Sequence, residues 1–211
     1  MKLAEGIAAL GLTLPLGAAD KLAAYLALLA KWNRVYNLTS IRDPEEMITH
    51  HLLDALAVLP ILQKSVPAGR QYALADVGSG AGLPGLVLAI ACPDWSVTSV
   101  EAVEKKAAFQ RQAKIALGLA NVSIHCGRVE DLKERFDAVI ARAFASLADF
   151  VKHAGHLADC LWAMKGGYPA AEVAVLPAGW SVAACHGLRV PGLGAQRCLL
   201  QLERVRACTS S

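Results

Sequence analysis

The stretch "ADVGSGAGLPG" (residues 75–85) holds four glycines in eight positions and directly follows a short apolar run. Glycine loses more backbone entropy on folding than any other residue, so a cluster this dense needs a structural reason. A glycine-rich loop after a strand permits a sharp turn, and it lets a ligand approach bare backbone beside the unpaired N–H groups of the next helix. The stretch therefore predicts a ligand-binding loop between a strand and a helix.

The chain beyond residue 66 alternates between short apolar runs and helical patterns, which predicts helices over 83–91, 105–117 and 147–158. Such alternation is typical of a mostly parallel sheet with right-handed crossovers and helices on both faces. The last two apolar runs follow each other without a clear helix, so we expect an antiparallel pair there. The expected strands cover 72–77, 97–101, 122–126, 136–141, 161–165, 181–185 and 198–205.

Residues 1–66 show helical spacing of apolar residues without the short apolar runs of the later chain. This pattern predicts a helical extension in front of the α/β domain of residues 67–211. One amphipathic helix is indicated by apolar residues at helical spacing. A second helix should begin at Asp43, followed by Pro44 in its first turn and Glu46 closing a capping box, and should stop near Pro60. The stripe of the first helix consists of Leu22, Tyr25, Leu26, Leu29 and Trp32.

Length and composition restrict the class of protein. A chain of 211 residues with 55% hydrophobic and 18% charged residues suits one packed domain and excludes a disordered chain. Its longest uncharged stretches are short and contain Pro and Gly, so none should span a bilayer, and Glu5 disfavours a secretory leader. The six cysteines form no C-x-x-C pair, so they predict no metal site. We expect a cytoplasmic monomer without a membrane partner.

The net charge of +3 is modest, and the basic residues form two groups. From the residues alone, solvated helix faces are favoured over phosphate-binding surfaces for both groups. The early group also contains the polar trio His50, His51 and Asp54, which more often tethers a helix than binds a metal. The groups are Lys31, Arg34 and Arg42 with His50 and His51, and Lys105, Lys106, Arg111 and Lys114.

Two ligands compete for the glycine loop. Gly80, Gly82 and Gly85 satisfy the G-x-G-x-x-G pattern of dinucleotide-binding proteins, and Glu101 lies at the right separation to bind a ribose diol. Asp76 favours a different ligand, because a carboxylate repels a pyrophosphate but attracts the ammonium and sulfonium groups of S-adenosylmethionine. Electrostatics therefore favours S-adenosylmethionine, with a nicotinamide dinucleotide as the alternative.

Six blocks in order resemble the small-subunit ribosomal RNA guanine-N7 methyltransferases, the glucose-inhibited division protein B family. The likeness spans roughly residues 25–205. The blocks are "KWNRVYNLTSIRDPEEMITHHLLDAL", "DVGSGAGLPGLVLAI", "VEAVEKKAAFQRQ", "GRVED", "FDAVIARAFASL" and "AMKG".

The resemblance implies a Rossmann-like methyltransferase fold that binds S-adenosylmethionine and methylates N7 of a guanine in 16S ribosomal RNA, free or in the small subunit. It places Gly78, Gly80 and Leu83 along the methionine and adenosine, Glu101 on the ribose, and Val129 with Glu130 at the adenine. Arg142 would lie near the cofactor, and Lys165 would be a cation on the substrate side. With Asp76, these residues are the expected cofactor and catalytic set.

Guanine N7 carries a lone pair that is not protonated at neutral pH, so the reaction needs no general base. We therefore assign Arg142 and Lys165 to positioning and electrostatic stabilisation. Because N7 lies in the deep major groove of A-form RNA, the target should be a loop or an opened base. Phe144 could stack on it or could equally be a core residue.

The remaining RNA contacts are expected from the helical extension, where Arg34, Asn37, Arg42 and His50 would meet phosphate or sugar. Two other functions stay open on the sequence alone. One is an NAD-dependent oxidoreductase, because of the G-x-G-x-x-G match. The other is a ribosome-binding factor that keeps the fold without the chemistry.

Overall fold

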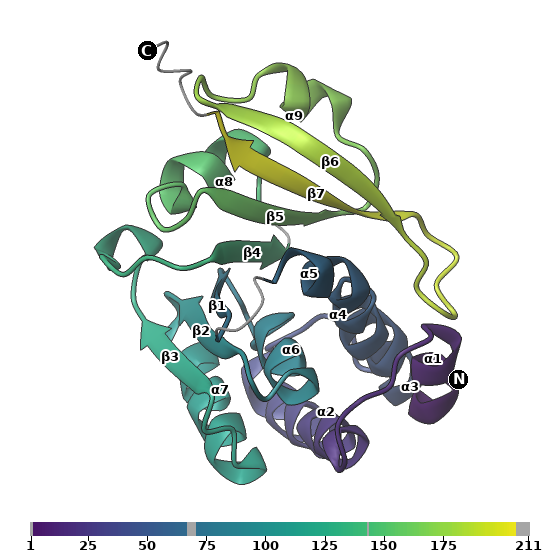
Figure 1. Cartoon of the computed structure of the whole chain (residues 1–211). Helices are drawn as coiled ribbons and strands as arrows, with labels where there is room; N and C mark the ends of the chain where they lie inside the picture. Colours follow the sequence, from purple (N-terminus) through teal and green to yellow (C-terminus); the bar gives the residue numbers. More distant parts are fainter. Residues whose placement is uncertain (1, 67–70, 143, 206–211) are drawn as a thin grey trace.

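A computed structural model describes residues 2–66, 71–142 and 144–205, and its centre is a seven-stranded sheet of order β3-β2-β1-β4-β5-β7-β6 (Figure 1). β1 to β5 run parallel, and β7 is antiparallel to both β5 and β6. The expected mostly parallel sheet with a closing antiparallel pair is confirmed. The strands are β1 Ala73–Val77, β2 Ser96–Glu101, β3 Val122–Cys126, β4 Ala138–Arg142, β5 Cys160–Lys165, β6 Trp180–Leu188 and β7 Arg197–Arg204.

The crossover helices are α6 (Gly85–Ala91), α7 (Glu104–Leu117) and α8 (Leu147–Ala154). The helix expected over 147–158 is too long. It ends at Ala154, and a Cβ on the next residue, Gly155, would lie 2.5 Å from the Val151 carbonyl oxygen. A short helix, α9 (Ala170–Ala174), follows β5 and was not expected, because five residues give too little periodicity to detect.

The helical extension contains α1 (Leu3–Ala9) and α2 (Ala18–Tyr36). From Pro44 to Ser65 it continues as a series of short helical elements. Asp43 caps α3 as expected, since its Oδ1 accepts hydrogen bonds from the backbone N–H groups of Glu45 and Glu46, both at 2.9 Å. The expected single helix up to Pro60 is wrong. It is instead α3 (Pro44–Met47), a π-helical segment η1 (Ile48–Leu53), α4 (Asp54–Leu56) and α5 (Leu59–Ser65).

Pro60 therefore opens α5 instead of ending the preceding helix. Proline lacks a backbone N–H, and the first turn of a helix is the place where no N–H is needed. The expected boundary between residues 66 and 67 adjoins residues 67–70, which lie outside the described residues.

The core has two parts, one on each face of the sheet. The larger part joins the extension to β1, β2 and α6, with Leu22, Leu29 and Leu52 fully buried among sheet residues such as Leu74 and Val97. The smaller part lies under α8. The extension and the sheet thus bury one continuous apolar surface, so the two segments stabilise each other.

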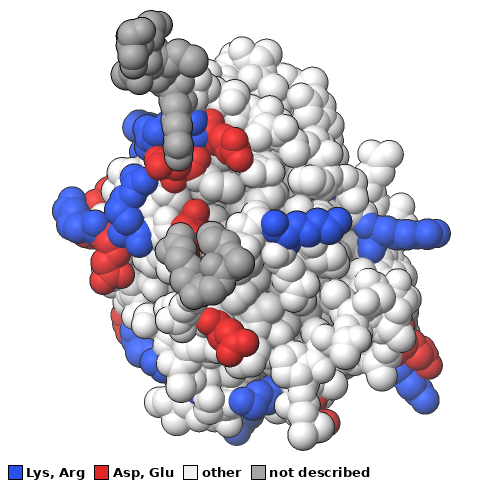
Figure 2. Space-filling model, in the orientation of Figure 1, with Lys and Arg blue, Asp and Glu red and all other residues white. Residues whose placement is uncertain are grey.

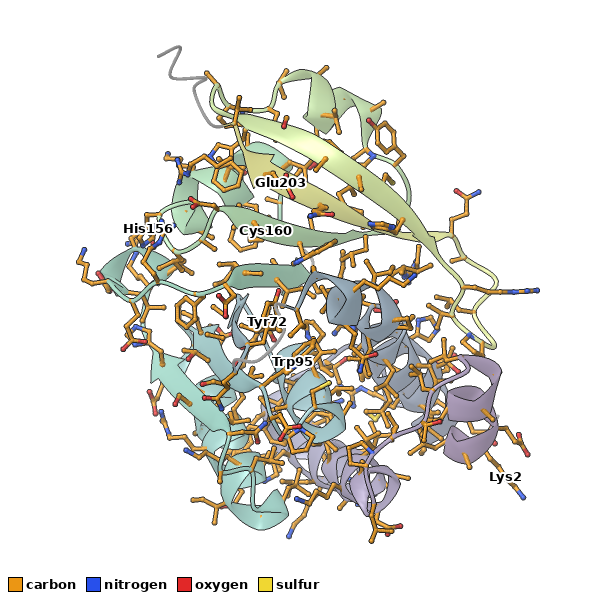
Figure 3. The ribbon with its side chains drawn as sticks, in the orientation of Figure 1. Lys2, Tyr72, Trp95, His156, Cys160 and Glu203 are labelled. Carbon is orange, nitrogen blue, oxygen red and sulfur yellow. The ribbon has the colours of Figure 1, made fainter. Side chains whose placement is uncertain are left out.

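Two aromatic residues pack together in front of β1 and β2. The rings of Tyr72 and Trp95, labelled in Figure 3, meet edge to face with their centroids 4.9 Å apart. Burial raises the pKa of Tyr72 to about 12.

On the face drawn in Figure 2, the described acidic and basic residues are scattered and much of the surface is uncharged, in keeping with the modest net charge. In the described part of the chain, no helix is long and apolar enough to cross a membrane.

Candidate active site

The glycine loop is held in a conformation that side chains rarely adopt. Gly78, Gly80 and Gly82 have φ values of +66°, +61° and +87°, in the left-handed region that favours glycine. The Gly80 N–H donates to Glu101 Oε2 at 2.7 Å, and the Val103 N–H donates to Glu101 Oε1 at 2.8 Å. Glu101 therefore fastens the loop to the end of β2.

The other side of the loop is fastened by buried polar side chains. Ser99 Oγ and Gln110 Nε2 donate to Ser79 Oγ at 2.7 and 2.8 Å, and Gln110 also donates to the Gly80 carbonyl at 2.8 Å. From the extension, Tyr25 donates to the Ala81 carbonyl at 2.8 Å, and burial raises the pKa of this phenol. α2 and α7 thus both position the loop.

A cavity of about 480 Å³, here called the glycine-loop pocket, opens beside this loop at the ends of β1 and β2. It brings together Gly78, Glu101, Val129 and Glu130, all from the expected cofactor set. Glu130 lies in a 3₁₀ turn, Val129–Asp131, and its Oε1 is 2.6 Å from His153 Nδ1. A backbone hydrogen bond and His153 lower the pKa of Glu130.

Four expected cofactor residues do not line this pocket: Asp76, Gly80, Leu83 and Arg142, of which Arg142 lines the second cavity described below. Asp76 is fully buried beneath the loop, where its Oδ2 accepts from the Gly85 N–H at 2.7 Å. Its Oδ1 has no hydrogen-bond partner among the described residues, and burial raises the pKa of Asp76 to about 7. Leu83 is buried in the core, and Gly80 turns its N–H to Glu101. Direct cofactor contact by all four stays a prediction.

A second cavity, of about 470 Å³, is here called the basic pocket. Three of its lining residues are cations: Arg142 ends β4, Lys165 ends β5 and Arg197 begins β7. The carboxyl ends of parallel strands meet at one edge, which is where open α/β sheets bind ligands. The other lining residues are Thr39, Ser40, Ile41, His50, His51, Asp54, Met164 and Gly166.

Asp54 joins two of these cations. It is 3% exposed, and its Oδ2 lies 3.3 Å from Arg142 Nη1 while its Oδ1 lies 3.2 Å from Arg197 Nε. Arg142 also donates to the His50 carbonyl at 3.0 Å. Sequence reasoning missed Arg197, because Asp54 and Arg197 are 143 positions apart and no motif connects them.

Lys165 is more constrained than a free substrate-side cation. Its Nζ lies 2.8 Å from Glu172 Oε2 and 3.4 Å from the Phe144 carbonyl. Glu172 also accepts from the Leu147 N–H at 2.7 Å, so this carboxylate ties α9 both to the end of β5 and to the start of α8. The site therefore holds its cations in place before a substrate arrives.

The expected RNA-binding residues fall into separate groups. Phe144 lines the glycine-loop pocket and packs on Phe150, with ring centroids 5.2 Å apart. Arg34 and Arg42 line a smaller cavity of about 200 Å³, where Arg42 donates to Asn37 Oδ1 at 3.0 Å. Of the six, His50 and Lys165 alone reach the basic pocket.

The polar trio of His50, His51 and Asp54 acts as a tether in the structure. His51 is buried, and its Nε2 lies 3.0 Å from Thr39 Oγ1, which links η1 to the loop after α2. Burial, with help from the Arg142 charge, lowers the pKa of His51 to about 4. Among the described residues, no cluster of His, Cys, Asp and Glu could hold a metal ion.

Acid is expected to destabilise the fold through His51. Its pKa falls from 6.5 to about 4 on folding, so the unfolded chain binds the extra proton between these values. The His51 contribution to the free energy of unfolding is therefore fully present above pH 6.5 and is lost as the pH falls from 6.5 to about 4. Urea titrations at several pH values measure the free energy of unfolding. His51→Asn should remove a pH dependence of up to about 1.4 kcal/mol per pH unit between the two pKa values. Equal slopes in both proteins would contradict the assignment.

Solved structures share this fold. Magnesium protoporphyrin IX methyltransferase from Synechocystis PCC 6803, solved with bound SAM, superposes with a TM-score of 0.59 at 15% identity, over 86% of this chain and 97% of that chain. TrmN from Thermus thermophilus superposes with a TM-score of 0.56 at 18% identity, over 75% of this chain and 53% of that chain. The likeness confirms the Rossmann-like methyltransferase fold.

Sequence comparison identifies the family. The family model described as rRNA small subunit methyltransferase G (GidB) matches residues 18–200. The protein named ribosomal RNA small subunit methyltransferase G from Azoarcus sp. (strain BH72) is 57% identical over 208 residues, 96% of this chain and 95% of that protein. Its namesake from Aromatoleum aromaticum is 54% identical over 211 residues, 96% of this chain and 97% of that protein. As the sequence blocks indicated, the chain belongs to the rRNA small subunit methyltransferase G family.

Proposed function

We propose that this protein transfers a methyl group from S-adenosylmethionine to N7 of a guanine in 16S ribosomal RNA, by direct in-line displacement without a general base. The observation that carries the proposal is the pairing of two cavities at the carboxyl edge of the sheet. The glycine-loop pocket carries the ribose-binding acid Glu101, and the basic pocket carries three fixed cations. Arg142, at the end of β4, lines the basic pocket, and Phe144, shortly before α8, lines the glycine-loop pocket.

The glycine-loop pocket fits the cofactor. Gly78 has no side chain, so its backbone is open at the wall of this pocket. A Cβ built on Gly78 would lie 3.7 Å from Cε2 of Phe144, another residue of the wall. The Glu101 carboxylate has about four lone-pair positions and uses two of them on backbone N–H groups, so it can also accept from ribose hydroxyls. Val129 and Glu130 face the adenine end. S-adenosylmethionine, when bound, supplies an electrophilic methyl group on a sulfonium.

The basic pocket receives the guanine and its phosphates. N7 needs no proton removed, so the protein has only to orient the base and exclude water. Arg142, Lys165 and Arg197 are already fixed by Asp54 and Glu172, and such preorganised charges need little rearrangement when the substrate arrives. An opened or looped base is required, because the major groove of A-form RNA is too narrow.

The NAD-dependent alternative rested on the G-x-G-x-x-G pattern and its separation from Glu101, and family membership accounts for both features without a nicotinamide cofactor. A ribosome-binding factor without chemistry is distinguished by a transfer assay. Labelled methyl should pass to small subunits from cells that lack this protein, and mapping should place it on N7 of one guanine. Binding of subunits without transfer would support the non-catalytic factor, and label on another atom would refute the assigned acceptor.

Arg34→Ala is expected to weaken RNA binding without affecting the cofactor. Arg34 is exposed on α2 beside Arg42, far along the chain from the glycine loop. Removing one phosphate contact should reduce the slope of log binding constant against log salt by about one. Filter binding at several salt concentrations measures this, with Lys21→Ala on the same helix as the control. A large loss of S-adenosylmethionine affinity would count against the assignment.

A further inference from the structure

The basic pocket lacks the kind of side chain that usually grips an unpaired base. Among the described residues that line it there is no Phe, Tyr or Trp. Phe144, the aromatic expected to stack on the target, lines the other pocket and packs on Phe150 and His153, with ring centroids 5.2 and 6.3 Å away. The described lining of the basic pocket therefore supplies no aromatic face for a base, which leaves the residues next to this lining as candidates.

The loop that follows β5 reaches this pocket. Gly166 lines the basic pocket, and a Cβ built on it would lie 4.0 Å from Arg197 Nη1. A Cβ on Gly167 would lie 3.7 Å from Gln196 Oε1. The next residue is Tyr168, which is 55% exposed. The loop thus passes beside Arg197 with two glycines and then presents an exposed ring.

This loop is braced at both ends. The ion pair between Lys165 and Glu172, 2.8 Å long, spans it from the last residue of β5 to α9. Inside the loop, the Ala170 N–H donates to the Tyr168 carbonyl at 3.1 Å. A ring on a short, fixed loop loses little conformational freedom when a ligand binds, which favours its use as a contact residue.

We propose that Tyr168 provides the aromatic face on which an unpaired RNA base stacks at the mouth of the basic pocket. The inference rests on the proposed function, because an RNA substrate supplies the base. The cations of the pocket attract phosphate, whereas an exposed ring two residues beyond the lining Gly166 offers a surface for stacking that depends little on base identity. Tyr168 is an RNA-contact residue in this assignment, and it takes no part in the methyl transfer itself.

The test compares Tyr168→Ala and Tyr168→Phe with the wild-type protein. The readout is the Kd for unmodified small subunits, together with kcat/KM for methyl transfer and the Kd for S-adenosylmethionine. Tyr168→Ala should weaken subunit binding about 5- to 150-fold, the range that one base–aromatic stack contributes. Tyr168→Phe should stay within about twofold, because the ring is kept. Tyr36→Ala is the matched control, a tyrosine 42% exposed on α2.

Three results would overturn the proposal. Tyr168→Ala could bind subunits as tightly as the wild type, Tyr168→Phe could lose as much affinity as Tyr168→Ala, or the affinity for S-adenosylmethionine could fall in parallel. Failure of the proposed function looks different. In that case the wild type binds subunits but places no methyl on guanine N7, while the subunit Kd of Tyr168→Ala still decides whether the ring contacts RNA.

Discussion

Asp54→Ala should lower the free energy of unfolding by about 2–4 kcal/mol and reduce methyl transfer at least ~100-fold. The buried Asp54 carboxylate faces the Arg142 and Arg197 guanidinium groups at 3.3 and 3.2 Å. Without it, two cations that are each about a quarter exposed would lie together with no counter-charge. They would repel each other and move, and a shift of about 1 Å in a positioning group can cost two orders of magnitude in rate.

Urea unfolding and transfer to small subunits measure the two effects separately. Asp20→Ala, at an exposed position in the first turn of α2, is the control; it should leave methyl transfer unchanged and lower the free energy of unfolding by no more than the ~0.3–1 kcal/mol of a helix-dipole contact. The double variant Asp54→Ala with Arg197→Met removes one unpaired cation, so it should regain part of the stability while activity stays low. An Asp54→Ala protein with the stability and activity of the wild type would show that this bridge contributes nothing.

The local parts of the fold could be predicted because local patterns determine them. β3 has the expected bounds, and the apolar stripe of α2 buries Leu22, Tyr25 and Leu29 as its spacing indicates. β6 was expected to end at Cys185 but extends to Leu188, because an edge strand with alternating half-buried and exposed residues carries a weak apolar signal. The π-helical segment η1 was missed for a related reason, since its apolar spacing resembles that of an α-helix.

The site could be predicted where strand ends determine it. The family resemblance placed Arg142 near the cofactor and Lys165 on the substrate side, and these residues end the neighbouring parallel strands β4 and β5, so they share one edge of the sheet. Arg197 reaches the same edge through antiparallel pairing, in which Lys165 faces Cys198, and this register leaves no motif in the sequence. Asp76 is the second-to-last residue of β1, and its carboxylate lies under the loop, where it accepts from the Gly85 N–H.

Glu101→Gln should have the second large effect, a loss of S-adenosylmethionine affinity of at least ~100-fold. Both Glu101 oxygens accept backbone N–H bonds, from Gly80 at 2.7 Å and Val103 at 2.8 Å. An amide keeps one acceptor oxygen but turns an NH₂ group toward one of these donors, so a single oxygen is left to serve both the loop and the ribose hydroxyls. Hydrogen bonds to a charged acceptor are worth about 1.5–3 kcal/mol, and the ribose is expected to lose at least one of them. Calorimetric titration and urea unfolding measure the result, with the exposed Glu134→Gln as the control.

The two measurements also separate the two roles of Glu101. If the carboxylate only fastens the loop, Glu101→Gln should lose stability by about 1–3 kcal/mol, while the folded fraction binds S-adenosylmethionine and S-adenosylhomocysteine as the wild type does. If it also accepts the ribose hydroxyls, affinity for both molecules should fall equally, because they share the ribose and differ only in the methyl group. Unchanged affinity would therefore refute the ribose assignment while leaving the loop's dependence on Glu101 intact.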